Sequence, residues 1–263
     1  MSQVIQCAQG SWDWHCSRAG RITASMFSEV RKRVGGLTDQ QATFVDRIRA
    51  GDARADAAKA AGYSKAPTGD KIERAIKGEH IGDYNETAKN YAFRLAVERI
   101  SGYPLDEGGF DTYAMRRGHE LEPEARALHE ERIGTLIEHA GFVVSDCGRF
   151  GASADGLIDN DGGSEYKCLI NPERIRAILF DGDISEFTDQ VQGGMWLTGR
   201  SYWDFALYCP ALAPAGRELE IYRLKRDEDY IAGLEADLSD FDLLVERYRG
   251  DLMSKQQSEQ VAA

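Results

Sequence analysis

The sequence has no long hydrophobic run. None of its 263 residues belongs to an apolar stretch near the roughly 18 residues that a membrane-spanning helix needs, so we expect no membrane span. The first residues, MSQVIQCAQGSW, lack the charged and apolar regions of a secretory signal. There is no internal repeat and no low-complexity segment. We therefore expect a cytoplasmic protein with one large domain, or one domain with an insert.

Cysteines are few, scattered and odd in number. The five cysteines lie at positions 7, 16, 147, 168 and 209, and no two of them have C-x-x-C spacing. This pattern argues against a zinc site and for reduced thiols, as in a cytosolic protein.

Positive charge is also scarce. The chain has 32 Lys and Arg against 44 Asp and Glu, a net charge of −12. Residues 1–118 contain 18 basic and 15 acidic residues, a net charge of +3, whereas residues 119–263 contain 14 and 29, a net charge of −15. An acidic exterior with a locally basic groove still admits DNA, so the charge is compatible with DNA binding but does not predict it.

One stretch, GASADGLIDNDGGSEYK at residues 151–167, places charged residues between apolar flanks. Residues 150–157 and 164–170 are predicted to be strands, and DNDGG at 159–163 is typical of a turn because Asn, Asp and Gly tolerate positive φ. The resulting hairpin would bring Asp155 back beside Glu165. Two residues apart in a strand, Glu165 and Lys167 would share one face while Tyr166 points away.

Two carboxylates and an ammonium group at one place suit the hydrolysis of phosphodiesters. Carboxylates hold Mg²⁺, which activates water and neutralises charge on phosphorus. A lysine beside the metal can orient or deprotonate the attacking water, or offset charge in the transition state. The alternative is a solvated hairpin with a surface ion pair. The apolar flanks favour the catalytic interpretation, because charges are seldom buried without a reason.

Two other segments carry candidate functions. Residues 24–33 can form a helix with Ser25 near its start, and Arg18 lies just before it, which suits a phosphate site; the alternative is a capping serine with a surface arginine. Residues 35–82 are predicted to be an insert of three short helices at 38–51, 53–61 and 68–80, either a helix-turn-helix unit or a bundle used for packing. We expect this insert to lie beside the site and to contact duplex DNA or a protein.

The remaining elements predict an α/β fold. Helices are expected at 86–100, 186–197 and 227–252, and strands at 201–208 and 220–224. A further helix at 111–133 is expected to break or kink near Pro123, which lacks a backbone N–H. One of its acids, Glu120, Glu122 or Glu124, would be a third metal ligand if it faced the hairpin; the alternative is a solvated acidic face.

Separated motifs support a family resemblance. They are WHxxRxGxITAS at 14–25, GxxxExxAR at 118–126 and GASADGL…ExKC at 151–168, with QVQxxMW at 190–196 and RDExY at 226–230. Together they resemble the phage lambda exonuclease-like family of recombination or alkaline exonucleases. The stretch LTDQQATFVDRIRAGDARADAAKAAGYS resembles the N-terminal helical domain of phage terminase small subunits.

The lambda resemblance implies a PD-(D/E)xK (restriction-endonuclease-like) core with a central mixed sheet flanked by helices. The core would comprise residues 1–34 and 83–263, and the helical insert residues 35–82. The implied activity is that of a deoxyribonuclease that degrades one strand of linear duplex DNA from its 5′ end and leaves a 3′ single strand. Mg²⁺, two per site, would be the cofactor, with Mn²⁺ as a substitute. A homotrimeric ring, a single-strand annealing protein as partner and a phage or prophage origin in a bacterial host are also implied.

The resemblance also implies a role for each matched residue. Asp155 and Glu165 become metal ligands, Lys167 the residue that acts on the attacking water, and Glu122 the ligand to a second metal. The remaining matches are the Tyr166 carbonyl as a metal ligand, Gln190 as a catalytic glutamine, and Arg18, Ser25 and Ser153 as the pocket for the 5′-phosphate. The chain departs from the family pattern at Ala154, where proline is common, and at the insert. The alternatives are an endonuclease of the same fold and a non-catalytic DNA-binding protein that uses residues 37–80.

Overall fold

The computed structural model describes residues 2–105 and 112–261, and the chain divides into two compact units. Unit 1 consists of Met1–Val30 and Asn90–Ala263, and unit 2 is Arg31–Lys89. Unit 2 contains all of residues 35–82, the predicted insert, and extends a few residues beyond it on both sides. None of the described helices is both long enough and apolar enough to cross a membrane.

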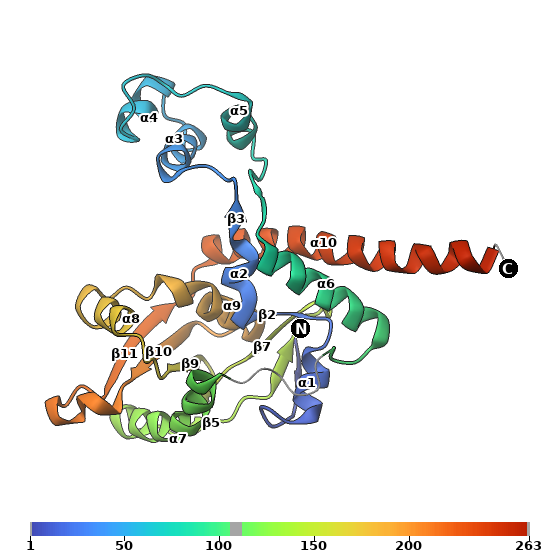
Figure 1. The fold of residues 1–263 in the computed structure, drawn as a ribbon. Helices are drawn as coiled ribbons and strands as arrows, with labels where there is room; N and C mark the ends of the chain where they lie inside the picture. Colours follow the sequence, from blue (N-terminus) through green and yellow to red (C-terminus); the bar gives the residue numbers. More distant parts are fainter. Residues whose placement is uncertain (1, 106–111, 262–263) are drawn as a thin grey trace. The chain divides into compact units, whose positions relative to one another are not determined.

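Unit 1 is built from two sheets and the helices around them (Figure 1). Its strands are β1 (Gln3–Ile5), β2 (Ile22–Thr23), β5 (Ile137–Glu138), β6 (Phe142–Val144), β7 (Phe150–Ser153), β8 (Gly156–Ile158), β9 (Gly162–Lys167), β10 (Tyr202–Tyr208) and β11 (Leu219–Lys225). The helices that lie wholly or mostly in it are α1 (Trp12–Arg18), α2 (Phe27–Arg31), α6 (Glu86–Ser101), α7 (Tyr113–Ile133), α8 (Pro172–Arg176), α9 (Thr188–Thr198) and α10 (Glu228–Val261).

Both sheets are mixed. One sheet has the order β1-β6-β7-β2 and the other the order β11-β10-β9-β8-β5. The pairs β2–β7 and β9–β10 are parallel, and the other pairs of these sheets are antiparallel. The predicted α/β class with a mixed sheet flanked by helices is confirmed.

Strand β10 shows why helices cover both faces of the larger sheet. Its residues Trp203, Phe205 and Leu207 are buried on one face, in a cluster with Val191 and Met195 of α9. The intervening residues Ala206 and Tyr208 point to the other face, in a cluster that contains Ala125 of α7. Apolar residues on both faces are typical of a strand buried between two helical layers, and the predicted strand at 201–208 is confirmed.

The predicted continuous strand at 150–157 is wrong. The chain leaves the smaller sheet after β7 and enters the larger sheet at β8, so Asp155 lies at the junction between the two. Glycines permit the close packing at this crossing. A Cβ atom on Gly151 would lie 2.2 Å from the Phe142 ring, and one on Gly156 would lie 2.2 Å from Ile137. The small residues of GASADG therefore let the strand change sheets.

Helix α7 is continuous through Pro123, so the predicted break is wrong. Proline removes one backbone hydrogen bond, the one to the carbonyl of His119 four residues earlier. His119 is exposed, so water can bind that carbonyl and the helix tolerates the loss. Residue 111, where the helix was predicted to start, lies outside the described residues, and the helix itself begins at Tyr113.

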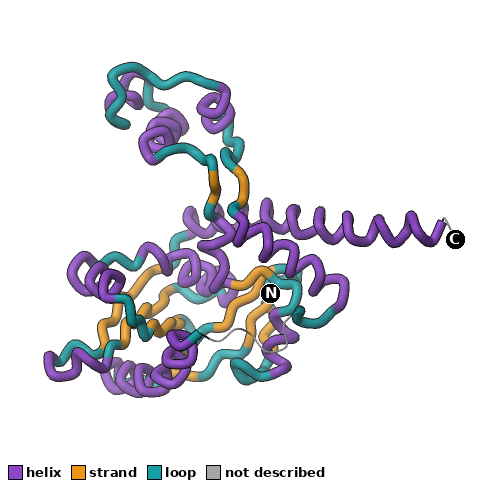
Figure 2. The backbone as a smooth tube through the Cα atoms, in the orientation of Figure 1, coloured by secondary structure: helices purple, strands orange, loops and turns teal. Residues whose placement is uncertain are grey.

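Unit 2 contains three short helices and a pair of two-residue strands (Figure 2). They are α3 (Asp39–Arg49), α4 (Arg54–Ala60), α5 (Asp70–Ile76), β3 (Arg33–Val34) and β4 (Asp83–Tyr84). Thr38 and Gln41 form a reciprocal capping box at the start of α3, with bonds of 3.2 and 3.0 Å. Phe44, Ala57 and Ile72 meet in a small core. The three predicted helices are confirmed.

Three arginines of unit 2 pair with carboxylates of the same unit. Arg54 lies 2.6 Å from Glu73, and Arg74 lies 2.7 Å from Glu79. Arg47 lies 3.3 Å from Asp52. These pairs reduce the positive potential that this unit can offer to a phosphate backbone.

Candidate active site

The β8–β9 hairpin brings the predicted residues together. Gly156 is opposite Ser164, so Asp155 and Glu165 are the next pair along the hairpin. The turn between the strands includes Asp159, the one described non-glycine residue with positive φ, at 46°. Glu165 and Lys167 lie on the face of β9 that carries Gln190 of α9, whereas the Tyr166 ring is buried on the α7 face. The predicted hairpin and its alternation are confirmed, but its bounds are not: β9 begins at Gly162, inside the predicted turn at 159–163, and ends at Lys167 rather than at residue 170.

Glu165, Lys167 and Gln190 form a closed triangle of hydrogen bonds. The Lys167 ammonium and the Gln190 amide both donate to Glu165 Oε1, each at 2.6 Å. Lys167 also donates to Gln190 Oε1 at 3.2 Å. Each side chain is therefore held by the other two, which fixes the geometry before any substrate is bound.

Asp155 is held by contacts on both sides. One of its carboxylate oxygens accepts the Tyr166 N–H at 2.8 Å, and its backbone carbonyl accepts Arg126 at 2.6 Å. Arg126 also donates to Glu122 at 2.8 Å and contacts the His139 ring at 2.8 Å. Arg126 thus links Glu122 on α7 to the strand junction. The motif at 118–126 contains this arginine, and its i,i+4 spacing from Glu122 is the signal that could have indicated the pair.

The acids of this cluster are unusually hard to ionise. Burial and then the charge of Asp155 raise the pKa of Glu165 to about 7. Burial and then the charge of Glu122 raise the pKa of Asp155 to about 6. Burial also raises the pKa of Glu122, although Arg126 opposes that shift. Like charges gathered this closely are unfavourable until a cation joins them.

Lys167 keeps its proton at neutral pH. Burial lowers the pKa of Lys167, but the charges of Glu165 and Asp155 outweigh it, and the pKa is raised above its ordinary value. A charged ammonium group donates hydrogen bonds and cannot accept a proton. Of the roles that the sequence left open, this favours orientation of the attacking water and stabilisation of charge over deprotonation.

The raised pKa of Glu165 predicts an unusual stability profile for the metal-free protein. Between pH 4.5 and about 7 the folded protein retains a proton that the unfolded chain has released, so the free energy of unfolding falls as the pH rises through this window. Glu165→Gln removes the ionisation. At pH 8 we expect the free energy of unfolding of Glu165→Gln to be at least ~1 kcal/mol higher than that of the wild-type protein.

Urea unfolding with a metal chelator at pH 5 and pH 8 measures this difference. The control is Glu235→Gln, which removes a carboxylate from an exposed position on α10 and should behave as wild type. A Glu165→Gln protein no more stable than wild type at pH 8 would contradict the proposed repulsion.

The residues present fit a hard divalent cation. Among the described residues, no group of three or more His, Cys, Asp and Glu side chains is close enough to hold a metal ion by itself. Two carboxylates with the nearby carbonyl of Tyr166 are nevertheless a sufficient donor set for Mg²⁺, which keeps several waters and usually takes only one or two carboxylates. Burial and a neighbouring acid raise the pKa values of Asp155 and Glu165, and a bound cation would oppose both effects.

Arg18, Ser25 and Ser153 gather around Trp14. The Arg18 guanidinium lies 4.2 Å from the centroid of the Trp14 ring and donates to Ser25 Oγ at 3.4 Å. It also donates to Thr23 Oγ1 at 3.3 Å. The Trp14 indole N–H donates to Ser153 Oγ at 2.8 Å. The structure therefore brings together the three predicted residues, although Ser25 lies in a 3-10 turn before α2, and sequence reasoning gave Trp14 and Thr23 no role.

Hydrogen bonds that involve residues of two motifs connect helix α9 to the start of α10. Tyr230 donates to Asp189 at 2.6 Å, and Gln192 donates to the Lys225 carbonyl at 2.9 Å and accepts the Asp227 N–H at 3.1 Å. Gln190 lies between Asp189 and Gln192 on the same helix. The motifs at 190–196 and 226–230 therefore position Gln190.

A cavity of about 710 Å³ lies on the α7 side of Asp155. Its lining includes Asp155, Glu122, Arg126 and His139, together with residues of the loop after β1. Asp155 and Glu122 therefore border a space large enough for part of a substrate.

Comparison with known proteins decides the family. The model of the YqaJ-like viral recombinase domain matches residues 13–201, which include every residue of the cluster and of the Arg18 pocket. The chain belongs to the YqaJ-like viral recombinase domain family. No curated protein matches the chain.

Two solved structures share the fold of this family member. The alkaline exonuclease LHK-Exo from Laribacter hongkongensis is 25% identical, with a TM-score of 0.65 over 94% of this chain and 99% of that chain. LHK-Exo in complex with dAMP is 24% identical, with a TM-score of 0.64 over 96% of this chain and 100% of that chain. The predicted lambda exonuclease-like family, its fold and the exonuclease class are thus confirmed.

Proposed function

We propose that this protein is a Mg²⁺-dependent exonuclease that degrades one strand of linear double-stranded DNA in the 5′-to-3′ direction and leaves a 3′ single strand for annealing. The observation that carries the proposal is the hydrogen-bonded cluster of Asp155, Glu165, Lys167 and Gln190 in a member of this family. The similarity to LHK-Exo, an alkaline exonuclease, supports it.

Each side chain has a defined part in the proposed reaction. Asp155, Glu165 and the Tyr166 carbonyl would hold one Mg²⁺, and Glu122 would contribute to a second; Mn²⁺ would substitute. When bound, the metal lowers the pKa of a coordinated water and neutralises charge that develops on phosphorus. Lys167 donates a hydrogen bond that orients the attacking water, and Gln190 holds both Lys167 and Glu165 in position.

The Arg18 pocket would bind the 5′-phosphate. Arginine pairs with phosphate in a fork of two hydrogen bonds, and the hydroxyl groups of Ser25 and Ser153 are additional donors. A 5′-phosphate bound there would place the 5′ end of the strand at the site, so hydrolysis would start at that end. By its family resemblance, the protein would act as a homotrimeric ring with a single-strand annealing protein, in the cytoplasm of a bacterial host.

Arg18→Ala is expected to slow digestion of 5′-phosphorylated duplex by roughly 10- to 100-fold, the scale of one charge-assisted hydrogen-bonded contact. Duplex with a 5′-hydroxyl end should be affected far less, because it offers no terminal anion. Initial rates on the two substrates measure the ratio, and Arg176→Ala, at an exposed site on α8, is the control. Equal losses on both substrates would place Arg18 in general backbone binding.

The form of the DNA separates the proposed exonuclease from an endonuclease of the same fold. Linear duplex and the same duplex as a covalently closed circle are incubated with the protein, with and without Mg²⁺. The proposal expects loss of the linear form alone, and only with metal. Cutting of the circle would favour the endonuclease. A protein that binds both forms and cuts neither would be the non-catalytic DNA-binding module that uses residues 37–80.

A further inference from the structure

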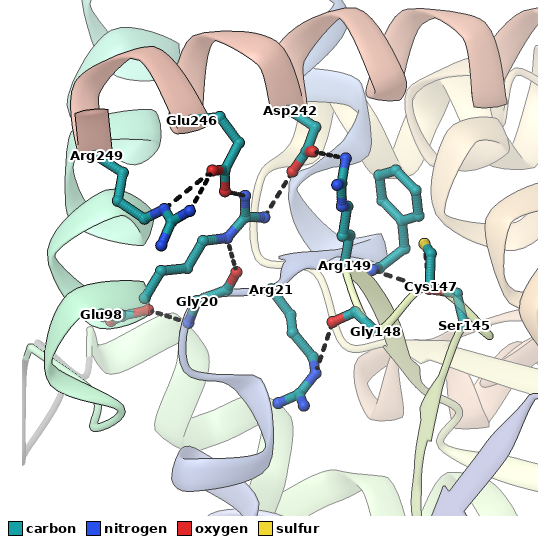
Figure 3. Close-up of polar contacts among 12 residues, drawn as sticks. Gly20, Arg21, Glu98, Ser145, Cys147, Gly148, Arg149, Asp242, Glu246 and Arg249 are labelled. Atoms are coloured by element: carbon teal, nitrogen blue, oxygen red, sulfur yellow. Dashed lines mark hydrogen bonds and ion pairs between the residues drawn. The ribbon is translucent and has the colours of Figure 1, made fainter. Parts of the chain in front are cut away.

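Unit 1 contains a second cavity, of about 340 Å³, whose lining is rich in arginine. We define the arginine cleft by the four arginines that line it, Arg21, Arg99, Arg149 and Arg249. They come from four separate segments: the α1–β2 loop, α6, the β6–β7 turn and α10. Figure 3 shows Arg149 and Arg249 on opposite sides of the Asp242 and Glu246 carboxylates of α10.

Arg99 is the fixed centre of the cleft. Its side chain is 14% exposed and contacts Glu246 at 2.8 Å and Asp242 at 2.6 Å. It also donates to the Gly20 carbonyl at 2.7 Å. Gly20 has φ of 70°, and a Cβ atom there would lie 2.9 Å from the Arg99 side chain. The glycine therefore lets the loop approach Arg99 and join α6 to α10.

The other three arginines use only some of their N–H groups in contacts within the protein. Arg149 contacts Asp242 at 2.6 Å and is 53% exposed, and Arg249 contacts Glu246 at 2.9 Å and is 47% exposed. Arg21 donates to the carbonyl oxygens of Ser17 and Gly148, at 2.7 and 3.1 Å. In the described part of the chain, no carboxylate pairs with Arg21. Each of these side chains thus has N–H groups to offer to a ligand.

The cleft is positive in a protein that is strongly acidic overall. Three guanidinium groups, those of Arg99, Arg149 and Arg249, share the two carboxylates of Asp242 and Glu246, and Arg21 adds a fourth cation. The whole chain, by contrast, has a net charge of −12. Burial and then the charge of Arg99 lower the pKa of Arg21, so both its desolvation and its cationic neighbour disfavour the charged guanidinium group. An anion in the cleft would oppose both effects, and the ligand that guanidinium groups bind best in this arrangement is phosphate.

The cleft and the catalytic cluster are joined by a strand. Arg149 immediately precedes β7, and β7 leads to Ser153 and then Asp155. The parallel strand β2 starts from the same side, with Ile22 opposite Phe150. Arg149 and Asp155 are six positions apart in the sequence, so their Cα atoms are at most about 22 Å apart. That span corresponds to about six base pairs of duplex at 3.4 Å each.

We propose that the arginine cleft binds a backbone phosphate of the DNA, within about six base pairs of the reacting end. The inference rests on the proposed function, because it assigns the cleft to the same substrate. A contact at this distance holds the DNA while the terminal nucleotide is removed. It also makes affinity depend on duplex length.

The test uses Arg149→Gln/Arg249→Gln, which leaves the structural Arg99 and Gly20 unchanged. Binding is measured without divalent metal, so that no DNA is cut, on 5′-phosphorylated hairpins with stems of about 4 and about 15 base pairs, shorter and longer than the span to the cleft. We expect the double variant to bind the long stem about 10-fold more weakly at low salt. The slope of log affinity against log salt should become smaller by about 1 to 2. Affinity for the short stem should be unchanged.

Two further variants make the result specific. Arg176→Gln/Arg217→Gln removes the same charge from exposed arginines outside the cleft, and Arg217, like Arg249, pairs with a glutamate three residues away. It should bind both stems as wild type. Arg149→Lys/Arg249→Lys retains the charge and should keep most of the slope of log affinity against log salt. A variant whose cleft had misfolded would lose that slope.

The proposal would be overturned if Arg149→Gln/Arg249→Gln bound the long stem as tightly as Arg176→Gln/Arg217→Gln does. That result would leave the exonuclease assignment intact. Equal weakening on both stems would also overturn the proposal, and so would binding of inorganic phosphate in the cleft with no change in DNA affinity. If wild-type protein neither bound nor digested either hairpin, the proposed function itself would fail.

Discussion

Asp155→Ala is expected to reduce metal-dependent hydrolysis of DNA to background while leaving the fold intact. The side chain removed is one of the two carboxylates at the hairpin, and nothing else in the cluster can replace its oxygens. Its one hydrogen bond in the structure is from the Tyr166 N–H, so the fold loses little. Loss of a negative charge from a group of repelling acids should even stabilise the metal-free protein.

The measurement is the release of acid-soluble nucleotides from linear duplex, with circular dichroism to verify the fold. Asp181→Ala is the matched control, because Asp181 is an exposed acid of the same unit, 3.4 Å from Arg176. The control should retain wild-type activity. Substantial activity in Asp155→Ala would show that the metal is held elsewhere.

Lys167→Ala is expected to lower the rate of hydrolysis by at least ~10²-fold, the scale of a positioned group that acts on the attacking water. Lys167 donates to Glu165 and Gln190 and remains protonated because the two acids raise its pKa. Protons compete with the metal for the acids, so at a limiting Mg²⁺ concentration the activity of the wild-type protein should rise with pH as the acids ionise. It should not require deprotonation of Lys167.

Single-turnover rates and calorimetric metal titration on the same protein separate the two possible roles of Lys167. Metal binding should persist in Lys167→Ala, because the carboxylates remain. Lys59→Ala, which removes an exposed lysine from α4, should match wild type in both assays. Loss of metal binding together with activity would mean that Lys167 mainly supports the structure of the site.

The parts of the site that sequence predicts are those encoded locally. The turn before β9 and the alternation of Glu165, Tyr166 and Lys167 both depend on residues within a few positions of one another, although the turn ends at residue 161 rather than 163. In each case the local preference and the tertiary structure agree, as expected for a chain with little internal conflict.

The parts that it does not predict depend on long-range contacts. Trp14 and Ser153 are 139 residues apart, and Arg99 and Glu246 are 147 residues apart, so no local pattern relates them. Strands as short as β1 and β2 are too brief to show a period. The change of sheet at Asp155 was hidden because GASADG, with its small residues, can be a strand as easily as a crossing point.

Digestion of a linear duplex labelled on both ends of one strand tests the central claim most directly. Wild-type protein and Asp155→Ala are compared with Mg²⁺ and with a chelator, and the products are resolved over time. The account predicts that wild type with Mg²⁺ releases the 5′ label first as a mononucleotide while the 3′ label remains on a shortening strand, and that the other three reactions release neither label. Early release of the 3′ label, or equal digestion by Asp155→Ala, would contradict it.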